Sequence, residues 1–370
     1  MISNKWIDLL NFTQQKTSAF PSIDTITEAL NQRVMFMKNQ FSETPNQTTE
    51  YIDWVEHEVF SSVMSDALKK PALKLEQAEF LYDLFLSVNL CQLCMSLLNH
   101  HGGLFPKGEL EIKQGIALQR MGEAQQAELA FHEASKLLPD SGLPLYHLAY
   151  CQLYSGNADL ALELFNQSAG KSPGFAPVWQ SIAGCHYQES RFEDALTACQ
   201  KARDLDSSIA PCYITAISSL LALERPEEAL IWLNLATQNQ INSPELDRLS
   251  GLCALQNNQP EAAIMSLSKY LEVHPDDMSV VAILAQALAV AEKWKEIQDV
   301  LLRLLKTDPH NHWCLEQLFL SYFHTKQWPK AEVVMNQLKQ TSEYYSNTYH
   351  EQFEKVNQQQ SIVLSNVNVN

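Results

Sequence analysis

The sequence predicts an all-α chain built as a solenoid of helical hairpins. Helix-forming Ala, Leu, Gln and Glu dominate it, and only 11 glycines occur in 370 residues, which disfavours an all-β fold with many tight turns. Prolines recur at one spacing, because Pro139 and Pro173 lie 34 residues apart and so do Pro275 and Pro309. Small apolar residues recur in the same register. A fixed period of this length indicates a stack of similar structural units.

Counting back from these prolines places repeat starts at residues 108, 142, 176, 210, 244, 278 and 312, and positions are numbered 1 to 34 within each repeat. Position 20 holds Ala127, Ala161, Ala195, Ala229, Ala263, Ile297 and Ala331. Position 8 holds Gly115, Ala149, Ala183, Ile217, Gly251, Ala285 and Phe319. Position 24 holds Phe131, Phe165, Cys199, Leu233, Leu267, Leu301 and Met335. Two antiparallel helices approach closely only where side chains are small, and a large neighbour fills the space beside the contact. The pattern therefore predicts hairpins.

This pattern resembles the tetratricopeptide repeat, a helix–turn–helix unit with a period of 34 residues. The resemblance covers residues 108–341 and implies seven repeats, fourteen helices and a right-handed superhelix. Gly122 and Gly156 at position 15 suit the turn between the two helices, and proline at position 32 ends the second helix. Ile297 and Phe319 occupy positions that usually hold small residues, so the last two hairpins are expected to splay more than the others.

The segments outside these repeats are less regular. Residues 74–107 are interpreted as a degenerate capping hairpin, because terminal repeats face water on one side. Residues 1–73 are predicted to form an N-terminal helical region, with helices over 4–14, 23–40 and 48–68. Residues 342–370 are polar and weakly periodic, so this tail is expected to fray. The sequence does not tell whether residues 1–73 dock on the repeats or block their groove.

The charge of the chain disfavours several classes of partner. Its 43 acidic and 26 basic residues give a formal net charge of −17, which repels phosphate backbones and anionic lipid headgroups. The longest apolar stretch, Val280 to Ala291, is shorter than the ~18 residues that a membrane span needs. No secretory leader is recognised at the first residues. We expect no nucleic-acid binding, no membrane insertion and a cytoplasmic location.

One cluster resembles a metal site. Cys91 and Cys94 lie three residues apart with His100 and His101 nearby, and zinc takes four such ligands in a tetrahedron. The predicted helix is apolar throughout and no second such cysteine pair exists, so core packing is favoured over zinc or redox chemistry. The group of His310, His312 and Cys314 at a repeat junction is interpreted in the same way.

Catalytic patterns are weaker still. The run Glu56-His57-Glu58 lacks a second histidine four residues after His57, so the metalloprotease motif fails. Asp276 and Asp277 follow Pro275 and suit a helix cap. No Ser/His/Asp or Cys/His set can be assembled. We expect no cofactor, no metal and no enzymatic activity, with chemistry in residues 1–73 as the remaining enzyme alternative.

A groove for a partner is the main functional prediction. In the family geometry the first helix of each repeat lines the concave side, with positions 2, 5, 9, 12 and 13 facing inward. The candidate groove residues are Ile112, Ile116, Leu143, Tyr146, Tyr150, Tyr154 and Tyr187. Tyr146, Tyr150 and Tyr154 are spaced by four, so they share one helical face. A Tyr150→Ala change is expected to weaken binding and to leave the melting temperature almost unchanged. The alternative is that these rings belong to the core or are covered by the N-terminal helices.

The resemblance also limits the kind of peptide. Family members that grip carboxylate tails of heat-shock chaperones use Lys at position 5 and Asn at position 9. Here these positions hold Ile112 and Ile116, then Tyr146 and Tyr150, then Gln180 and Gly184, so the carboxylate clamp is disfavoured.

Residues Leu145 to Leu205 are similar to bacterial type III secretion chaperones of the translocator class, which hold an extended segment of a secreted protein in an apolar groove. The first hypothesis is therefore an adaptor or chaperone that binds an apolar or amphipathic segment of another protein. The alternative is a scaffold for several partners without a dedicated peptide groove. The identity of the partner, the pathway and the oligomeric state are not encoded in a readable form.

Overall fold

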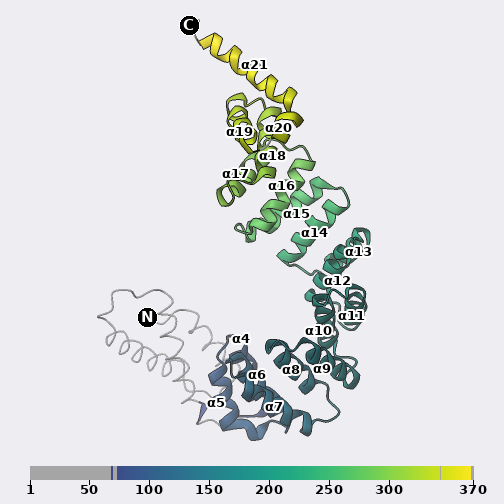
Figure 1. Ribbon diagram of the computed structural model, residues 1–370. Coiled ribbons are helices and arrows are strands. Elements are labelled where there is room, and N and C mark those ends of the chain that lie inside the picture. Colours follow the sequence, from purple (N-terminus) through teal and green to yellow (C-terminus); the bar gives the residue numbers. More distant parts are fainter. Residues whose placement is uncertain (1–67, 70–72, 342, 368–370) are drawn as a thin grey trace, which may run out of the picture. The chain divides into compact units, whose positions relative to one another are not determined.

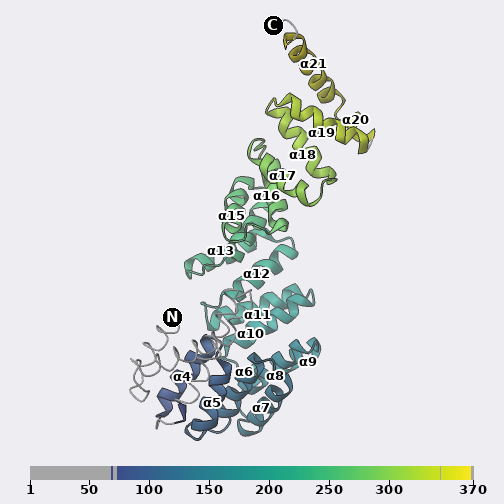
Figure 2. The ribbon, with the colours of Figure 1, turned by 90° about the vertical axis from the view of Figure 1, so that its left-hand side faces the viewer.

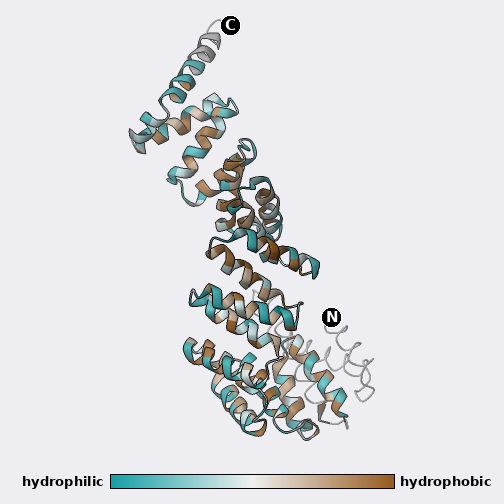
Figure 3. Ribbon diagram, turned by 90° about the vertical axis from the view of Figure 1, so that its right-hand side faces the viewer, coloured by the Kyte–Doolittle hydropathy of each residue, from teal (hydrophilic) through white to brown (hydrophobic). Residues whose placement is uncertain are grey.

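The computed structural model describes residues 68–69, 73–341 and 343–367, and within these residues the regular structure is helical with no β-strand. The all-α solenoid expected from the sequence is confirmed. The chain divides into two compact units, unit 1 ending at Val178 and unit 2 beginning at Trp179. Figure 3 shows hydrophobic stretches along the helices and hydrophilic residues at many of the turns. The expected helices at 4–14 and 23–40, and all but the last residue of that at 48–68, lie outside the described residues.

Unit 1 consists of hairpins laid next to one another in chain order (Figures 1 and 2). Its first elements are α4 (Leu75–Ser87), α5 (Cys91–His101) and the 3₁₀ turn η1 (Gly102–Leu104). They are followed by α6 (Glu109–Arg120), α7 (Ala124–Leu137), α8 (Leu143–Tyr154) and α9 (Ala158–Lys171). The Tyr82 hydroxyl of α4 donates to the Lys113 carbonyl of α6 at 2.6 Å, which attaches the α4–α5 hairpin to the next repeat.

Helix α10 (Ala176–Gln188) crosses the boundary between the units. Unit 2 continues with α11 (Phe192–Leu205), α12 (Ala210–Ala222), α13 (Pro226–Gln238), α14 (Pro244–Gln256), α15 (Pro260–Val273), α16 (Met278–Val290), α17 (Glu296–Thr307), α18 (His312–His324), α19 (Trp328–Thr341), α20 (Glu343–Thr348) and α21 (His350–Val367). Asp277 caps α16, since its carboxylate accepts from the backbone N–H groups of Ser279 and Val280 at 3.1 and 3.3 Å.

Small residues set the contact inside each hairpin. The side chains at position 20, from Ala127 to Ala331, have no exposed surface at all. A Cβ added to Gly115 would lie 2.5 Å from the Phe131 ring, and one added to Gly251 would lie 2.5 Å from Leu267. Positions 8 and 24 of one repeat therefore touch, as the residue pattern predicts. The α16–α17 and α18–α19 pairs, which carry Ile297 and Phe319, pack less closely than α6–α7 and α14–α15.

The turn inside each hairpin uses one left-handed residue. All seven residues at position 15 have φ between 53° and 82°: Gly122, Gly156, Ser190, Glu224, Asn258, Glu292 and Lys326. A hydrogen bond closes this turn, as when the Glu123 N–H donates to the Leu118 carbonyl at 2.9 Å. The sequence showed this role only where position 15 is glycine. In the other five repeats a side chain is held where glycine would be at ease.

Glycine at position 15 should therefore stabilise a repeat that lacks it. Glu224→Gly is expected to raise the free energy of unfolding of unit 2 by about 0.5–1 kcal/mol, because left-handed backbone costs an L-residue about 1–2 kcal/mol. The reverse change Gly156→Ala should lower the stability of unit 1 by a similar amount. The shift in urea midpoint, followed by circular dichroism, measures both. Equal behaviour of the two variants would contradict the role assigned to the turn.

The C-terminal segment differs from the expectation of a frayed tail. Residues 343–367 form α20 and α21. Phe353 and Val356 of α21 are buried in the same hydrophobic cluster as Leu338 of α19. The segment is polar overall, yet these few apolar residues lie on the face that meets α19. Tertiary packing therefore holds a helix that the composition of the tail did not indicate.

Candidate functional site

The tyrosines of α8 form a connected row in unit 1. The Tyr146 ring lies 5.0 Å from that of Tyr150, and Tyr150 lies 6.4 Å from Tyr154. Tyr150 also meets the edge of the buried Phe165 of α9 at 5.2 Å. Tyr154 at the end of the row is 77% exposed. The spacing of four therefore brings the three rings together, as predicted, and the exposed surface of the row increases toward Tyr154.

The inner part of this row is also part of the packing of unit 1. Tyr146 lies 5.7 Å from Phe165 and 5.0 Å from Phe175, both edge or tilted contacts. Tyr146 and Tyr150 are half-buried. Replacing Tyr150 would remove its contact with Phe165, so the expectation of an unchanged melting temperature for Tyr150→Ala does not hold. Tyr154 is the residue of this row that can be changed without disturbing the core.

The other predicted groove residues are placed differently. Ile112 is buried with 5% exposure and offers no open surface, which corrects its assignment as a groove residue. Ile116 is half-buried against the cluster of Phe131 and Leu148, and Leu143 is half-buried at the start of α8. Tyr187 belongs to unit 2, where it lies 5.6 Å from Phe192 and is 37% exposed. In unit 1 the open part of the predicted groove is therefore the tyrosine row.

A histidine beside the row escaped the sequence analysis. The His147 ring stacks on Phe131 of α7, with centroids 4.9 Å apart and planes 10° from parallel. It also meets the edge of Tyr146 at 5.3 Å. Burial lowers the pKa of His147 to about 4, because an apolar environment disfavours the charged imidazolium. A histidine inside the run Leu143–Tyr154 was the only available signal.

The metal-like clusters have other partners in the structure. Cys91 and Cys94 are buried in α5, and burial raises the pKa of the Cys94 thiol to about 12. His100 Nδ1 donates to the Ser96 carbonyl at 2.7 Å, and His101 Nε2 donates to the Leu68 carbonyl at 2.8 Å. Among the residues that the structure describes, no three metal-binding side chains gather in one place. The run Glu56-His57-Glu58 lies outside those residues.

The remaining cysteines are also packed inside. All eight cysteines of the chain are free thiols and buried, from Cys91 in α5 to Cys314 in α18. Asn311, rather than a metal, meets the junction before α18, because its side-chain oxygen accepts from the Cys314 N–H at 3.0 Å. Core packing of the cysteines is therefore what the structure shows where the sequence left a choice.

A second surface lies on the second helices of the repeats. Position 22 is exposed and apolar in four repeats, with Leu129 67%, Ile231 58%, Met265 71% and Val333 61% exposed. In unit 2 a hollow of about 590 Å³ opens between α17, α18 and α19, and another of about 610 Å³ opens between α13, α14 and α15. The sequence analysis followed the first helices and did not consider this surface.

Comparison with known proteins decides the family. The family model of the tetratricopeptide repeat matches residues 112–176. This chain is a tetratricopeptide-repeat protein. The matched segment runs from α6 to the start of α10 and includes the tyrosine row.

Individual relatives of this tetratricopeptide-repeat protein are distant. Anaphase-promoting complex subunit 7 of Dictyostelium discoideum is 28% identical over 149 residues, which is 39% of this chain and 25% of that protein. The chain thus spans a quarter of the length of this relative. Among solved structures, Pseudomonas aeruginosa pilF has a TM-score of 0.49 at 16% identity and covers 55% of this chain and 92% of its own. The Cut9–Hcn1 structure of the anaphase-promoting complex has a TM-score of 0.48 at 14% identity, covering 84% and 65%.

Tetratricopeptide-repeat proteins bind other proteins, as adaptors or scaffolds, and this coarse function extends to the chain. In the described part of the chain, no helix combines the length and the apolar character that a membrane span requires. The surfaces available for a protein partner are therefore the tyrosine row of unit 1 and the exposed apolar residues of the second helices.

Proposed function

We propose that this protein is an adaptor or chaperone that holds an apolar or amphipathic segment of another protein along the tyrosine row of α8. The observation that carries the proposal is a connected row of three rings that ends in Tyr154, which is 77% exposed. A large aromatic surface left in water has no folding advantage, whereas a partner would desolvate it. The proposed location is the cytoplasm, where the thiols stay reduced.

The row is suited to a peptide segment because its inner rings are held in place. Tyr150 rests on Phe165, and Tyr146 is flanked by Phe165 and Phe175. Rings that are already ordered lose little conformational entropy when a partner binds. Tyrosine offers a wide apolar face while its hydroxyl remains available to a polar group of the segment or to water.

Tyr154 provides the test of this proposal. Tyr154→Ala should weaken binding of a partner captured by the full chain by roughly 1–4 kcal/mol, the range for central anchors. Because the interaction gains from desolvation, raising the salt concentration should change the affinity little. Isothermal titration with the captured partner measures both effects. The melting temperature should stay constant, since Tyr154 is mostly exposed.

Tyr344→Ala is the matched control, since Tyr344 is a 61% exposed tyrosine of α20 in unit 2. It should leave the same affinity unchanged. Equal binding by the Tyr154→Ala variant and wild type would contradict the proposed groove. Loss of binding with salt but not with Tyr154→Ala would assign the interaction to the acidic surface instead.

A finer assignment is a chaperone of a secretion system. It rests on the similarity of Leu145–Leu205 to translocator-class chaperones and on the apolar row that this segment contains. Under this assignment the captured partner is one secreted or membrane-disrupting protein, and mass spectrometry of the captured material should show a single major species. Deletion of residues 1–73 should leave its capture intact.

The alternative is a scaffold that assembles several partners without a dedicated groove. Two observations favour it. The curated relative is a subunit of a multiprotein complex by name, and exposed apolar side chains recur at position 22 in both units. A scaffold should capture a set of proteins at fixed ratios, and Tyr154→Ala should leave most of that set bound. The third alternative, an enzyme with its chemistry in residues 1–73, would require turnover of a substrate by that segment.

A further inference from the structure

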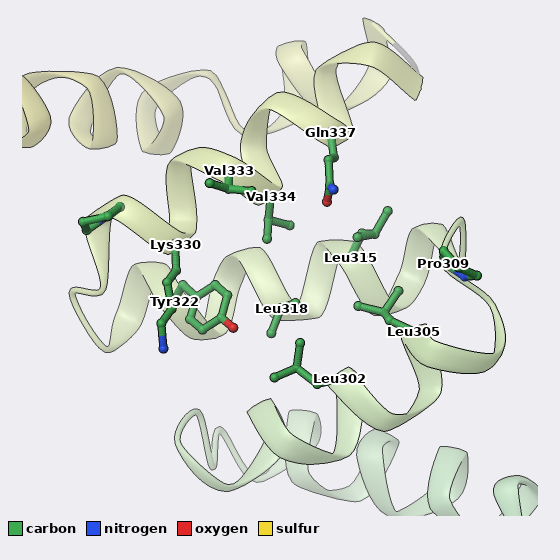
Figure 4. Close-up of a pocket in the computed structure, with 11 residues that line it drawn as sticks. Leu302, Leu305, Pro309, Leu315, Leu318, Tyr322, Lys330, Val333, Val334 and Gln337 are labelled. Atoms are coloured by element: carbon green, nitrogen blue, oxygen red, sulfur yellow. The ribbon is translucent and has the colours of Figure 1, made fainter.

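The hollow between α17, α18 and α19 is lined almost entirely by apolar side chains (Figure 4). Leu302 and Leu305 come from α17, and they face Leu315 and Leu318 of α18. Val333 of α19 lies at the rim. Leu302 is 42% exposed and Val333 is 61% exposed, so part of this lining remains in water. Its volume of about 590 Å³ lies within the range of about 300–1,000 Å³ that is usual for binding pockets.

The apolar lining departs from the repeat pattern. Position 25 is polar in every other repeat, where it holds His132, Asn166, Gln200, Asn234, Ser268 and Asn336. The hollow between α13 and α15 uses the same repeat positions with Asn234, Thr237, Asp247 and Ser250. Leu302 is thus an exposed leucine at a position that the other repeats fill with a polar residue. Folding gains little from it, because burial of apolar surface is what stabilises.

A lysine gives this hollow a charge. Lys330 lies in the first turn of α19, where no acidic residue is present, and its ammonium group is 5.3 Å from the centre of the Tyr322 ring. No carboxylate in the described part of the chain forms an ion pair with it. A cation at a helix N-terminus opposes the helix dipole and costs some stability. Lys330 is therefore unfavourable for the chain alone and favourable for an approaching carboxylate.

We propose that this hollow binds an amphipathic helix of a partner protein, with leucine-type side chains against α17 and α18 and a carboxylate side chain over Lys330. A helix fits because α17 and α19 flank the hollow as two ridges with α18 as its floor (Figure 4). The carboxylate meets both the ammonium group and the positive end of α19. This site is separate from the tyrosine row, since all its residues belong to unit 2.

Synthetic peptides test the proposal directly. The probes are fluorescein-labelled helical peptides of roughly 14 residues, about four turns, with leucine on one face and glutamate at either end. Matched peptides carry lysine in place of glutamate. Fluorescence anisotropy with the full chain should show at least one glutamate peptide binding about tenfold more tightly than its lysine partner. Lys330→Glu should reverse this preference, and Leu302→Asn should weaken all peptides about tenfold or more.

Ile231→Asn is the matched control, because it changes an exposed aliphatic residue of α13 outside this hollow and should leave peptide affinity unchanged. Both Leu302 and Lys330 are exposed, so melting curves of their variants should match wild type. The proposal is overturned if no peptide binds below about 1 mM, if Leu302→Asn behaves as Ile231→Asn, or if Lys330→Glu keeps the preference. Self-association that Leu302→Asn abolishes would identify a second copy of the chain as the occupant and overturn the proposed partner.

Discussion

Replacing Gly115 with alanine should destabilise unit 1 by about 1–3 kcal/mol, the usual cost of overpacking, although alanine is the better helix former. The added Cβ would lie 2.5 Å from Cε1 of Phe131, a ring with no exposed surface. Neither α6 nor α7 can move away without disturbing a neighbouring repeat. The same change at Gly251, against Leu267, should act likewise on unit 2. Urea unfolding followed by circular dichroism measures both effects.

Gly170 supplies the control with the opposite sign. It lies in α9, and a Cβ added there would meet no atom within 4 Å. Gly170→Ala should therefore stabilise the chain by about 0.5–1 kcal/mol through helix propensity alone. Both substitutions add one methyl group to one helix of unit 1. If both shifted stability in the same direction, close packing at position 8 would not be what holds the hairpins together.

The stability of unit 1 should fall by about 2 kcal/mol between pH 7 and pH 5 because of one buried histidine. Burial lowers the pKa of His147 from 6.5 to about 4 in the folded chain. Between these two values the unfolded chain binds a proton that the folded chain does not. The contribution of His147 to stability is thus full above about pH 6.5, declines as the pH falls through the window, and declines no further below about pH 4.

His147→Phe should remove most of this pH dependence, since phenylalanine can keep the stacking on Phe131 without titrating. Urea unfolding at a series of pH values gives the slope directly. His132→Phe controls for the loss of a histidine as such, because His132 lies on α7 with a 55% exposed side chain. An unchanged slope in the His147→Phe variant would show that carboxylates, not His147, govern the acid sensitivity of unit 1.

The fold was predictable from the sequence to the extent that side-chain size follows the period of 34. Ala127 and its equivalents mark the helix contacts because only small residues fit there. The left-handed turns at Glu224, Glu292 and Lys326 were not predictable, since these residue types have no preference for positive φ. Helix α21 was missed because its formation depends on the burial of Phe353 and Val356 against α19, a tertiary effect that a polar segment does not advertise.

The candidate site was predictable in part for the same reason. The spacing of Tyr146, Tyr150 and Tyr154 fixes them on one face of a helix, but their depth depends on Phe165 and Phe175, which approach from other elements. The hollow beside Leu302 was missed because position 25 was not compared across the repeats. That comparison was possible from the sequence, whereas the cavity itself requires the placement of three helices.

The eight buried thiols turn the chain into a set of built-in reporters of local opening. They are distributed over α5, α8, α10, α11, α12, α14 and α18, so most stretches of the array contain at least one. Burial raises the pKa of Cys151 and Cys185 to about 11 each, which keeps both thiols protonated and slow to react while their helices stay packed. Because each repeat contacts mainly its neighbours, different helices can open with different free energies. The labelling rate of each cysteine by a thiol reagent, followed by mass spectrometry, would then rank the repeats by local stability without any substitution.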